Sequence, residues 1–300
     1  PDMKPGDSFM LNAPYNGGTH LPDITVVQPV WNDAGDAVLF FTAARGHHTD
    51  VGGLTPGSMP PDSRTIHDEG AYIDNFRLTA GGVFQEEATR KLLLSAKYPV
   101  RAVDINVADL KAQMAACEKG AQELRRMVSQ FGIDVVEAYM RHVQDNAEEC
   151  VRRAIETLKD ATYTYPMDPD FDGNPREIKV KISVDKTART ATIDFTGTTG
   201  QLATNYNAPE PVTRAAVLYV FRLLVDDNIP MNEGVMKPLN VVLPKGTMLS
   251  PQYPAAVIAG NVETSQAVTS ALLLSLGVQA ASQSTMNNTT WGNAKYQYYE

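Results

Sequence analysis

Two long stretches of helical periodicity in the middle of the chain most constrain its fold. Apolar residues recur at intervals of three and four over Val107–Gln130 and again over Ile133–Lys159, with Gly132 between them. This spacing predicts two amphipathic helices, which we expect to form an antiparallel pair packed on a sheet. Because strand-like segments precede and follow these helices without a regular strand–helix repeat, the sequence predicts a mixed α/β (α+β) fold.

Short β-type runs flank the helical stretches on both sides. In the first part, the turn-rich segment Asn32–Asp36 separates two such runs and predicts a β-hairpin. Further helices are expected at 83–96 and 211–225, and another from an N-cap at Asn261 to a stop at Gly277. We expect two portions, residues 1–160 with the helical pair and residues 161–300 as a second α/β portion. The expected strands are Ser8–Leu11, Thr25–Trp31, Ala37–Thr42, Ile178–Val184, Thr190–Phe195 and Leu239–Leu243.

The charge balance limits the classes of partner. The 26 Lys and Arg residues against 35 Asp and Glu residues give a formal net charge of −9. Nucleic-acid backbones and anionic membranes attract clustered basic side chains, so we expect neither as a partner. The longest apolar stretches, near 212–225 and 268–281, fall short of the ~20 residues that a membrane-spanning helix needs.

Two features indicate the compartment and the extent of the chain. No apolar leader follows Pro1, and the two cysteines, Cys117 and Cys150, lie in stretches with helical periodicity. Both are expected to be reduced structural thiols, which fits a cytoplasmic protein. The chain begins beside a strand and ends within a strand-like run, so we expect it to be a segment of a longer polypeptide.

Histidines gather near the start of the chain. His20 and Asp23 stand three residues apart just before one expected strand, and His47 follows another. If these strands pair as a hairpin, its outer end brings the three side chains together. Two imidazoles and a carboxylate suit Zn²⁺, Mn²⁺ or Fe²⁺, with positions left for water. The alternative is a pair of capped loop ends without a metal.

The loop Gly46–Pro61, which is rich in Gly, Pro, Ser and His, contains two neighbouring candidates. Loops of this length in compact domains are more often functional than idle. His48 and Asp50 lie in this loop directly after His47. His67 follows further along the chain, where a role in orienting a ligand and a purely structural role both stay open.

Several blocks, in order along nearly the whole chain, resemble the hydantoinase-B/5-oxoprolinase family. They include Asn12–Asp23, which contains His20, and Arg45–Gly53, which contains the His-His pair, and so many blocks in order are highly specific. Within the family, the blocks at 55–61 and 82–88 look like single-chain 5-oxoprolinases more than two-subunit N-methylhydantoinases. The remaining blocks are Thr55–Pro61, Gly82–Ala88, Asp109–Gln113, Asp194–Thr198, Asn207–Pro209, Gly260–Gln266 and Met286–Asn288.

The resemblance implies a hydantoinase-B-like fold and the ATP-dependent hydrolysis of 5-oxo-L-proline (pyroglutamate) to L-glutamate. This segment would supply the metal-bearing, hydrolytic half and contact the lactam substrate. A hydantoinase-A-type half, fused or separate, would bind ATP and Mg²⁺. That division agrees with Gly197–Gly200, which lacks the lysine of a GxxxxGK[ST] phosphate cradle. A homo- or hetero-oligomer is expected.

The resemblance also implies the metal ligands. Related lactamases and acetone carboxylases hold a metal through residues that match His20, Asp23 and His47, and a further carboxylate ligand would precede Pro1. The spacing from Asp23 to His47 is slightly longer than in the carboxylases. His48 therefore stays open as the ligand in place of His47.

Other side chains receive expected roles on the same basis. Asp50 or His48 would act as a general base or would orient a ligand. Asn261 and Thr264, at the start of an expected helix, would receive an anionic group such as a carboxylate or phosphate. Simple helix capping is the alternative for Asn261.

Three other functions stay open at this point. The chain resembles, in turn, an N-methylhydantoinase or other lactamase B subunit and a subunit of an ATP-dependent acetone or acetophenone carboxylase. Turnover of 5-oxoproline against acetone, with ATP and bicarbonate, separates the hydrolase from the carboxylase. A non-catalytic scaffold is the third alternative, and it predicts no bound metal.

Overall fold

The computed structural model describes residues 3–170, 173–278, 290–292 and 297–299. The predicted mixed α/β class is confirmed, because the chain forms two compact units that each combine a sheet with helices. The first unit contains the described residues up to Glu137, with Ala203–Asn205 and Tyr253–Ile258, and the second contains Ala138–Leu202, Tyr206–Gln252 and the described residues from Ala259 onward.

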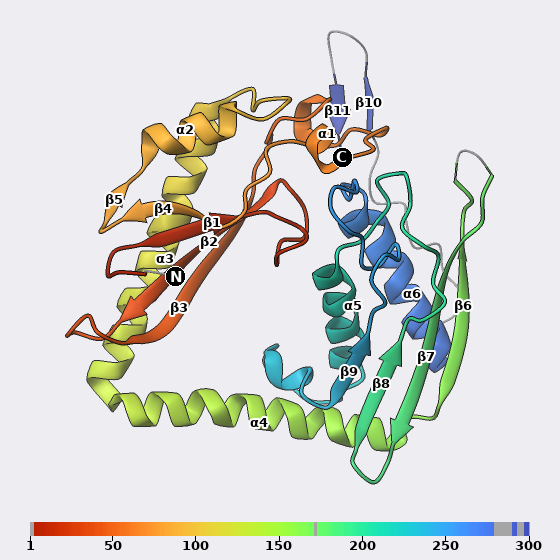
Figure 1. Ribbon diagram of the computed structural model, residues 1–300. Helices are drawn as coiled ribbons and strands as arrows, with labels where there is room; N and C mark the ends of the chain where they lie inside the picture. Colours follow the sequence, from red (N-terminus) through yellow and green to blue (C-terminus); the bar gives the residue numbers. More distant parts are fainter. Residues whose placement is uncertain (1–2, 171–172, 279–289, 293–296, 300) are drawn as a thin grey trace. The chain divides into compact units, whose positions relative to one another are not determined.

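An antiparallel five-stranded sheet lies at the centre of the first unit, with the strand order β3-β2-β1-β4-β5 (Figure 1). The predicted hairpin is confirmed as β2 and β3. Both strands extend further at the outer end than the sequence indicated, because their ladder continues to the pair Asp23 and His47. The strands are β1 Ser8–Leu11, β2 Asp23–Trp31, β3 Val38–His47, β4 Phe76–Ala80 and β5 Val83–Phe84.

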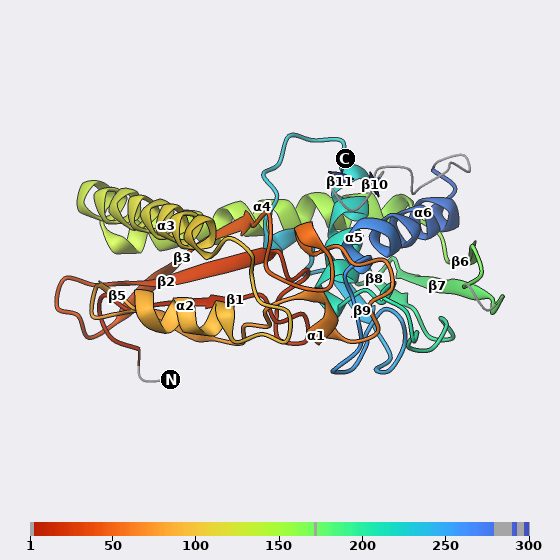
Figure 2. The same cartoon turned by 90° about the horizontal axis from the view of Figure 1, so that it is seen from above.

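One long helix, α3, packs on β2 and β3 of this sheet (Figure 2). Its buried apolar residues include Leu110, Cys117 and Ala121, whose spacing of seven and four keeps them on one helix face. Leu110 and Cys117 pack in the core that contains Ile24 and Val26 of β2, and Ala121 lies beside this core. The helices of this unit are the 3₁₀ turn η1 Pro56–Ser58, α1 Ile66–Glu69, α2 Glu86–Leu94 and α3 Val103–Phe131.

The two long helices lie where the periodicity predicts, but the expected antiparallel pair is wrong. The first of them, α3, packs on the sheet of the first unit. The second, α4 (Ile133–Thr157), contributes Ala147, Val151 and Ile155 to the core of the second unit. Periodicity identifies which face of a helix is buried but not the element that buries it. The first turn of α4 contributes Val136 to a cluster with Ala121 of α3, whereas most of its buried face lies in the core of the second unit.

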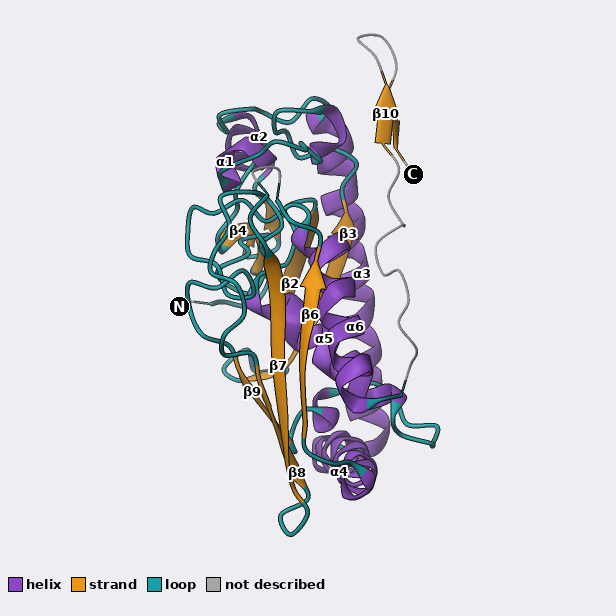
Figure 3. Ribbon diagram, turned by 90° about the vertical axis from the view of Figure 1, so that its right-hand side faces the viewer, coloured by secondary structure: helices purple, strands orange, loops and turns teal. Residues whose placement is uncertain are grey.

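The second unit contains a four-stranded sheet with the strand order β6-β7-β8-β9 (Figure 3). The expected strands Ile178–Val184 and Thr190–Phe195 are confirmed as β7 and β8, which pair antiparallel, and β9 joins β8 in parallel. Alternate residues of β7, Ile178, Val180 and Ile182, are buried in the core together with Phe195 and Phe221. The strands are β6 Ala161–Met167, β7 Arg176–Asp185, β8 Thr190–Asp194 and β9 Leu239–Val242.

Helix α6 (Ser265–Leu276) packs on β6 and β7 and against α5 (Glu210–Leu223). It ends as predicted at Gly277, whose φ of 67° is left-handed. Its predicted start is wrong, because Asn261 makes no capping hydrogen bond and lies inside a π-helical turn, Gly260–Thr264, that precedes α6. A Cβ on Gly260 would lie 2.1 Å from the carbonyl oxygen of Asn207, so this turn is packed tightly against a neighbouring segment.

The remaining described elements are short. They are the 3₁₀ turn η2 Glu233–Val235, and β10 Thr290–Gly292 paired antiparallel with β11 Gln297–Tyr299. The family-like block Met286–Asn288 lies outside the described residues. Cys117 and Cys150 are both free and buried. Within the described ranges, no helix combines the length and apolar character that a membrane crossing requires.

Candidate metal-binding and hydrolytic site

The outer end of the β2–β3 hairpin brings three predicted site residues together. Asp23 and His47 are direct partners in the ladder, and the Nδ1 atom of His47 lies 2.8 Å from Oδ1 of Asp23. The ring of His20 stacks on the ring of His47, with centroids 5.6 Å apart and planes inclined by 15°. The register of the hairpin thus produces the proximity that the sequence predicted.

A tight turn carries His20 to this position. The N–H of Asp23 donates to the carbonyl of His20 at 2.9 Å, so the chain reverses directly into β2. A Cβ on Gly18 would lie 2.3 Å from the carbonyl oxygen of Asn12, and only glycine allows this approach. The N–H of His48 donates to the carbonyl of Pro22 at 2.8 Å, which fastens the second loop to the first.

The protonation states of the three residues follow from their surroundings. His20 is 2 % exposed, and burial lowers the pKa of its imidazole to about 4, so the ring is neutral near pH 7. Burial opposes ionisation of Asp23, but its hydrogen bond with His47 and the charge effect of the nearby imidazoles together hold its pKa below the usual value. The same hydrogen bond raises the pKa of His47.

The donor chemistry of this cluster fits a divalent transition metal. Neutral imidazole and ionised carboxylate are the forms that bind Zn²⁺, Mn²⁺ or Fe²⁺. The Nδ1 atom of His20 is buried and has no hydrogen-bond partner among the described residues, which is unusual for an imidazole nitrogen. The described residues nevertheless contain no group of three such side chains already arranged around one metal position.

His48 occupies a different environment from His47. It is buried, its Nε2 lies 3.0 Å from Oε1 of Gln113, and its Nδ1 lies 3.1 Å from Nδ2 of Asn106. An amide oxygen only accepts and an amide nitrogen only donates, so the assigned amide orientations place the proton of His48 on Nε2. Burial lowers the pKa of this ring. Both of its nitrogens are therefore engaged within the protein.

Asp50 organises the loop that follows. Its Oδ1 accepts from the N–H groups of Gly52 (2.9 Å) and Arg101 (3.1 Å). Its Oδ2 accepts from the N–H of Gly57 (3.1 Å) and from Nη1 of Arg101 (2.8 Å). A carboxylate with both oxygens satisfied in this way holds a loop in shape, and it has less freedom to exchange protons with a substrate.

Two residues of α3, Asn106 and Gln113, were missed by the sequence reasoning. The amide nitrogen of Gln113 donates to the carbonyls of Ile24 (2.7 Å) and Ala44 (2.9 Å), one on each strand of the hairpin. Asn106 donates to the carbonyl of Asp50 at 2.8 Å, besides its bond to the ring of His48. Both amides are buried and stand seven residues apart on the apolar face of α3. Polar residues on the apolar face of a predicted helix could have identified both of them from the sequence.

The other predicted residues lie elsewhere. His67 is exposed on α1, where its Nε2 is 2.7 Å from the hydroxyl of Tyr253. Asn261 and Thr264 belong to the second unit, whereas the histidine cluster belongs to the first. Thr264 donates its hydroxyl to the carbonyl of Tyr206 at 2.6 Å. The Oδ1 atom of Asn261 is buried without a hydrogen-bond partner among the described residues.

Comparisons with known proteins give the context of this site. The sequence model of the family described as Hydantoinase B/oxoprolinase matches residues 1–300. A curated relative, 5-oxoprolinase 1 of Arabidopsis thaliana, is 42 % identical over 318 residues, which cover 100 % of the chain and 25 % of the relative. The chain thus spans about a quarter of the length of the curated relatives that it matches most strongly.

Two solved structures share the fold. The crystal structure of an ATP-dependent caprolactamase from Pseudomonas jessenii matches with a TM-score of 0.79 and 25 % identity, over 91 % of this chain and 47 % of that one. A nucleotide-free acetone carboxylase matches with a TM-score of 0.75 and 18 % identity, over 92 % of this chain and 37 % of that one. The second likeness is evidence for the fold alone.

Proposed function

The chain belongs to the Hydantoinase B/oxoprolinase family, and we propose that it supplies the metal-binding, hydrolytic part of an ATP-dependent 5-oxoprolinase. The proposed reaction opens the lactam ring of 5-oxo-L-proline to give L-glutamate. The observation that carries this proposal is the meeting of His20, Asp23 and His47 at one hairpin end. The similarity to a curated 5-oxoprolinase along the whole chain supports the choice of substrate.

We propose His20, Asp23 and His47 as the protein ligands of a Zn²⁺, Mn²⁺ or Fe²⁺ ion. Such an ion, when bound, supplies Lewis acidity that polarises a carbonyl group and lowers the pKa of water. His20 is held neutral by burial and has an unpartnered Nδ1 atom. Asp23 is held ionised by its hydrogen bond with His47. These are the protonation states that ligation needs.

The ATP-binding site is proposed to lie in a hydantoinase-A-type half, fused to this chain or separate, together with Mg²⁺. A five-membered lactam is a weak electrophile. Transfer of the γ-phosphoryl group of ATP to the amide oxygen would activate the ring carbon, with ADP as the leaving group. Addition of water to that carbon and cleavage of the ring C–N bond, with a proton passing to the leaving nitrogen, would then give an acyl phosphate, and a second water would release phosphate to leave the open amino acid.

His48 and Asp50 are proposed to orient the site instead of exchanging protons. Both nitrogens of His48 and both oxygens of Asp50 are engaged with neighbouring groups. Because both nitrogens of His48 are already engaged, we propose His47 as the ligand in its place. The hydrogen bond between His47 and Asp23 is made by Nδ1 of His47 and not by its Nε2 atom. Groups that fix a ligand in this way typically contribute 10–100-fold to metal affinity or activity.

Asn261 and Thr264 are proposed as contacts for an anionic group of the substrate, and the case is stronger for Asn261. The hydroxyl of Thr264 already donates to the carbonyl of Tyr206. The side-chain amide of Asn261 has a buried atom without a partner, and oxygen and nitrogen of an amide exchange places by a simple flip. With its nitrogen turned toward a ligand, Asn261 would donate to a carboxylate or phosphate.

A lactamase with another ring substrate is the second candidate function. The likeness to an ATP-dependent caprolactamase favours it, because that protein's name also describes lactam hydrolysis. The proposal of a ketone carboxylase has less support, since the acetone carboxylase is 18 % identical. A non-catalytic scaffold does not account for the buried, unpartnered Nδ1 of His20.

The test uses the complete protein that contains this chain together with its ATP-binding half. We expect ATP-dependent release of L-glutamate from 5-oxo-L-proline, and no consumption of acetone with ATP and bicarbonate. The purified protein should contain close to one Zn, Mn or Fe ion per chain by elemental mass spectrometry, and His20→Ala should lose it. Turnover of caprolactam or acetone in preference to 5-oxo-L-proline would replace the proposed substrate.

A further inference from the structure

A buried carboxylate lies outside the histidine cluster, at the end of α1. Glu69 is 0 % exposed, and the groups that donate to it are a hydroxyl and two peptide N–H groups. Its Oε1 accepts from Ser63 Oγ (2.9 Å), from the N–H of Val257 (3.0 Å) and from the N–H of Ile258 (3.0 Å). Its Oε2 accepts from the N–H of Val257 at 3.1 Å. A carboxyl group is costly to bury, so this placement calls for a reason.

The segment that Glu69 holds is remote in sequence but belongs to the first unit. Tyr253–Ile258, which we name the strap, begins more than 180 residues after Glu69, and Val257 and Ile258 lie 188 and 189 residues from it. Both are buried. The strap is fastened at its other end as well, because Ile66 donates its N–H to the carbonyl of Pro254 at 3.0 Å.

The strap continues from Glu69 to the histidine cluster. The backbone of Ile258 also faces the imidazole of His20, whose pKa it raises against the larger effect of burial, while its N–H donates to Glu69 at 3.0 Å. One residue therefore joins the buried carboxylate to the ring. Because Nδ1 of His20 has no partner among the described residues, the contact with Ile258 is the polar restraint on this ring that the structure provides.

We propose that Glu69 is a positioning residue for His20: by fixing the N–H groups of Val257 and Ile258, it sets the backbone group that orients the His20 ring. This inference rests on the proposed function, because the orientation of His20 matters only if the ring is a ligand. Glu69 acts through the backbone of Val257 and Ile258 and is not proposed to contact the substrate or the metal. Asn106 and Gln113 have the corresponding role for His48, on the other side of the cluster.

The geometry explains why a carboxylate suits this position. Two oxygens accept four hydrogen bonds from three donors, and both oxygens face the N–H of Val257. In Glu69→Gln, the amide nitrogen replaces an acceptor and faces another donor, so the strap must shift while most of the packing is retained. In Glu69→Ala, two buried N–H groups and the Ser63 hydroxyl lose their acceptor, which costs more.

The experiment compares Glu69→Gln, Glu69→Ala and Thr79→Val in the complete protein. Thr79 is a matched control, since its buried hydroxyl donates to the carbonyl of Gly6 (2.8 Å) and lies 2.9 Å from Ser8 Oγ in the same unit, with no bond to the strap among these contacts. We measure kcat, the KM for ATP, the melting temperature, and the optical spectrum of the metal-free protein titrated with Co²⁺. The visible bands of Co²⁺ report the geometry of its ligands.

The expected result is a fall in kcat of about 10–100-fold for Glu69→Gln, with unchanged KM for ATP. Its Co²⁺ bands should move and weaken, and Glu69→Ala should be affected more. Thr79→Val should lower the melting temperature without changing kcat or the Co²⁺ spectrum. Wild-type kcat and Co²⁺ binding in Glu69→Gln would overturn the inference, and so would an equal loss of kcat in Thr79→Val.

Failure of the proposed metal site and failure of the positioning role of Glu69 give different experimental results. If His20→Ala retains wild-type turnover and Co²⁺ binding, the proposed metal site is wrong, and the inference about Glu69 falls with it. If His20→Ala is inactive while Glu69→Gln is unaffected, the metal site stands and the positioning role alone is overturned. The isosteric Glu69→Gln variant carries the test even if Glu69→Ala does not fold.

Discussion

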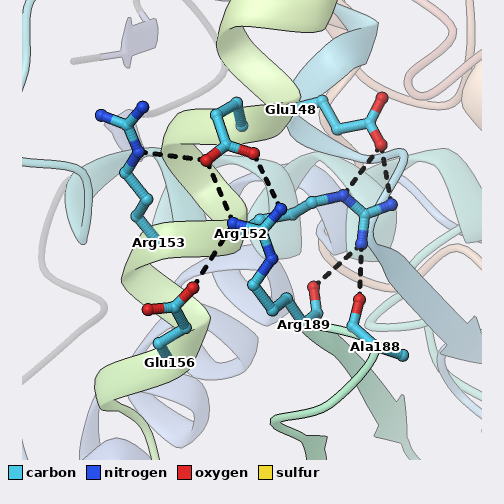
Figure 4. Close-up of polar contacts among 7 residues, drawn as sticks. Glu148, Arg152, Arg153, Glu156, Ala188 and Arg189 are labelled. Carbon is cyan, nitrogen blue, oxygen red and sulfur yellow. Dashed lines mark hydrogen bonds and ion pairs between the residues drawn. The ribbon is translucent and has the colours of Figure 1, made fainter.

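In the first unit, His48, Asn106 and Gln113 are buried and satisfy one another's hydrogen-bonding atoms, whereas in the second unit Arg152 and Arg189 pair with glutamates at the surface (Figure 4). The first arrangement is buried, and burial lowers the pKa of the His48 imidazole. The second consists of charged groups that remain partly exposed along α4. Of the two, the buried network holds a proposed site residue, His48, in place.

The pKa values of carboxyl groups in the two regions are also shifted in opposite directions. Burial raises the pKa of Glu69 to about 7, although its hydrogen bonds oppose the shift. Glu149, which is partly exposed, has its pKa lowered first by its hydrogen bonds with Arg189 and second by its hydrogen bond with Arg153. A polar residue that the protein buries at a cost is therefore a better guide to function than one that it pairs at the surface.

The largest effect is expected from His47→Ala in the complete protein. Loss of a proposed ligand should lower the turnover of 5-oxo-L-proline by more than about 100-fold, since losing a group that merely orients a ligand costs 10–100-fold. Nucleotide binding should be retained, because its site is proposed to lie outside this chain. Glutamate release and ATP binding are measured in parallel. If His47→Ala keeps its activity while His48→Ala loses it, the ligand has been assigned to the wrong histidine.

A smaller but still large effect is expected when the buried network is broken. Gln113→Met keeps the length of the side chain and removes its bonds to Ile24, Ala44 and His48. Buried groups left without partners cost about 1–3 kcal/mol each, so the free energy of unfolding should fall by at least that amount in denaturant titrations. Turnover should fall with it. Unchanged stability would mean that water replaces the amide and that the network is not essential.

The pH dependence of stability should distinguish the buried carboxylate. The pKa of Glu69 is about 7 in the folded chain against an ordinary 4.5, so the folded state holds the proton more tightly. Stability from this group is therefore greatest below pH 4.5 and is lost as the pH rises toward 7. In Glu69→Gln, the decline in the free energy of unfolding between pH 5 and 7 should be smaller than in the wild type, by on the order of 2 kcal/mol. Melting curves of both proteins across this range provide the measurement, and parallel curves would contradict it.

The smallest effect is expected at the surface network. Arg189→Gln removes ion pairs with Glu149 and Glu156, and exposed pairs contribute about 0–1 kcal/mol. The change in unfolding free energy should stay below about 1 kcal/mol and should shrink further at high salt. Turnover should not change. A loss of activity in this variant would show that the contrast between the two regions has been drawn too sharply.

The hairpin and its site could be predicted because they depend on local patterns. Alternation defined the strands, the turn at Asn32–Asp36 defined their pairing, and pairing alone places Asp23 beside His47. The helical periods of α3 and α4 were equally clear in the sequence. The residues 83–84, expected at the start of a helix, form the short strand β5, since its two residues pair with β4, which the sequence reasoning did not identify.

The parts that could not be predicted depend on contacts between distant segments. Gln113 looks like an ordinary helical residue until β2 and β3 supply its two carbonyl partners. Glu69 stands in an acidic stretch that reads as exposed, and its donors lie nearly two hundred residues later in the sequence. The helix expected from Asn261 is an α-helix only from Ser265, after a π-helical turn in which Gly260 is packed against Asn207. No local pattern carries this information.

The strap has a consequence for how the protein is made. A ribosome that adds about 5–20 residues per second needs roughly 10–40 s to proceed from Glu69 to Ile258, a separation of 189 residues. During that interval the nascent chain can form the hairpin and α3, but the carboxylate of Glu69 lacks its backbone donors and His20 lacks its restraint. Synthesis therefore leaves the histidine cluster without this restraint until nearly all of the second unit's strands have emerged, so premature termination within that unit would leave His20 unrestrained even though His20, Asp23 and His47 have already been translated.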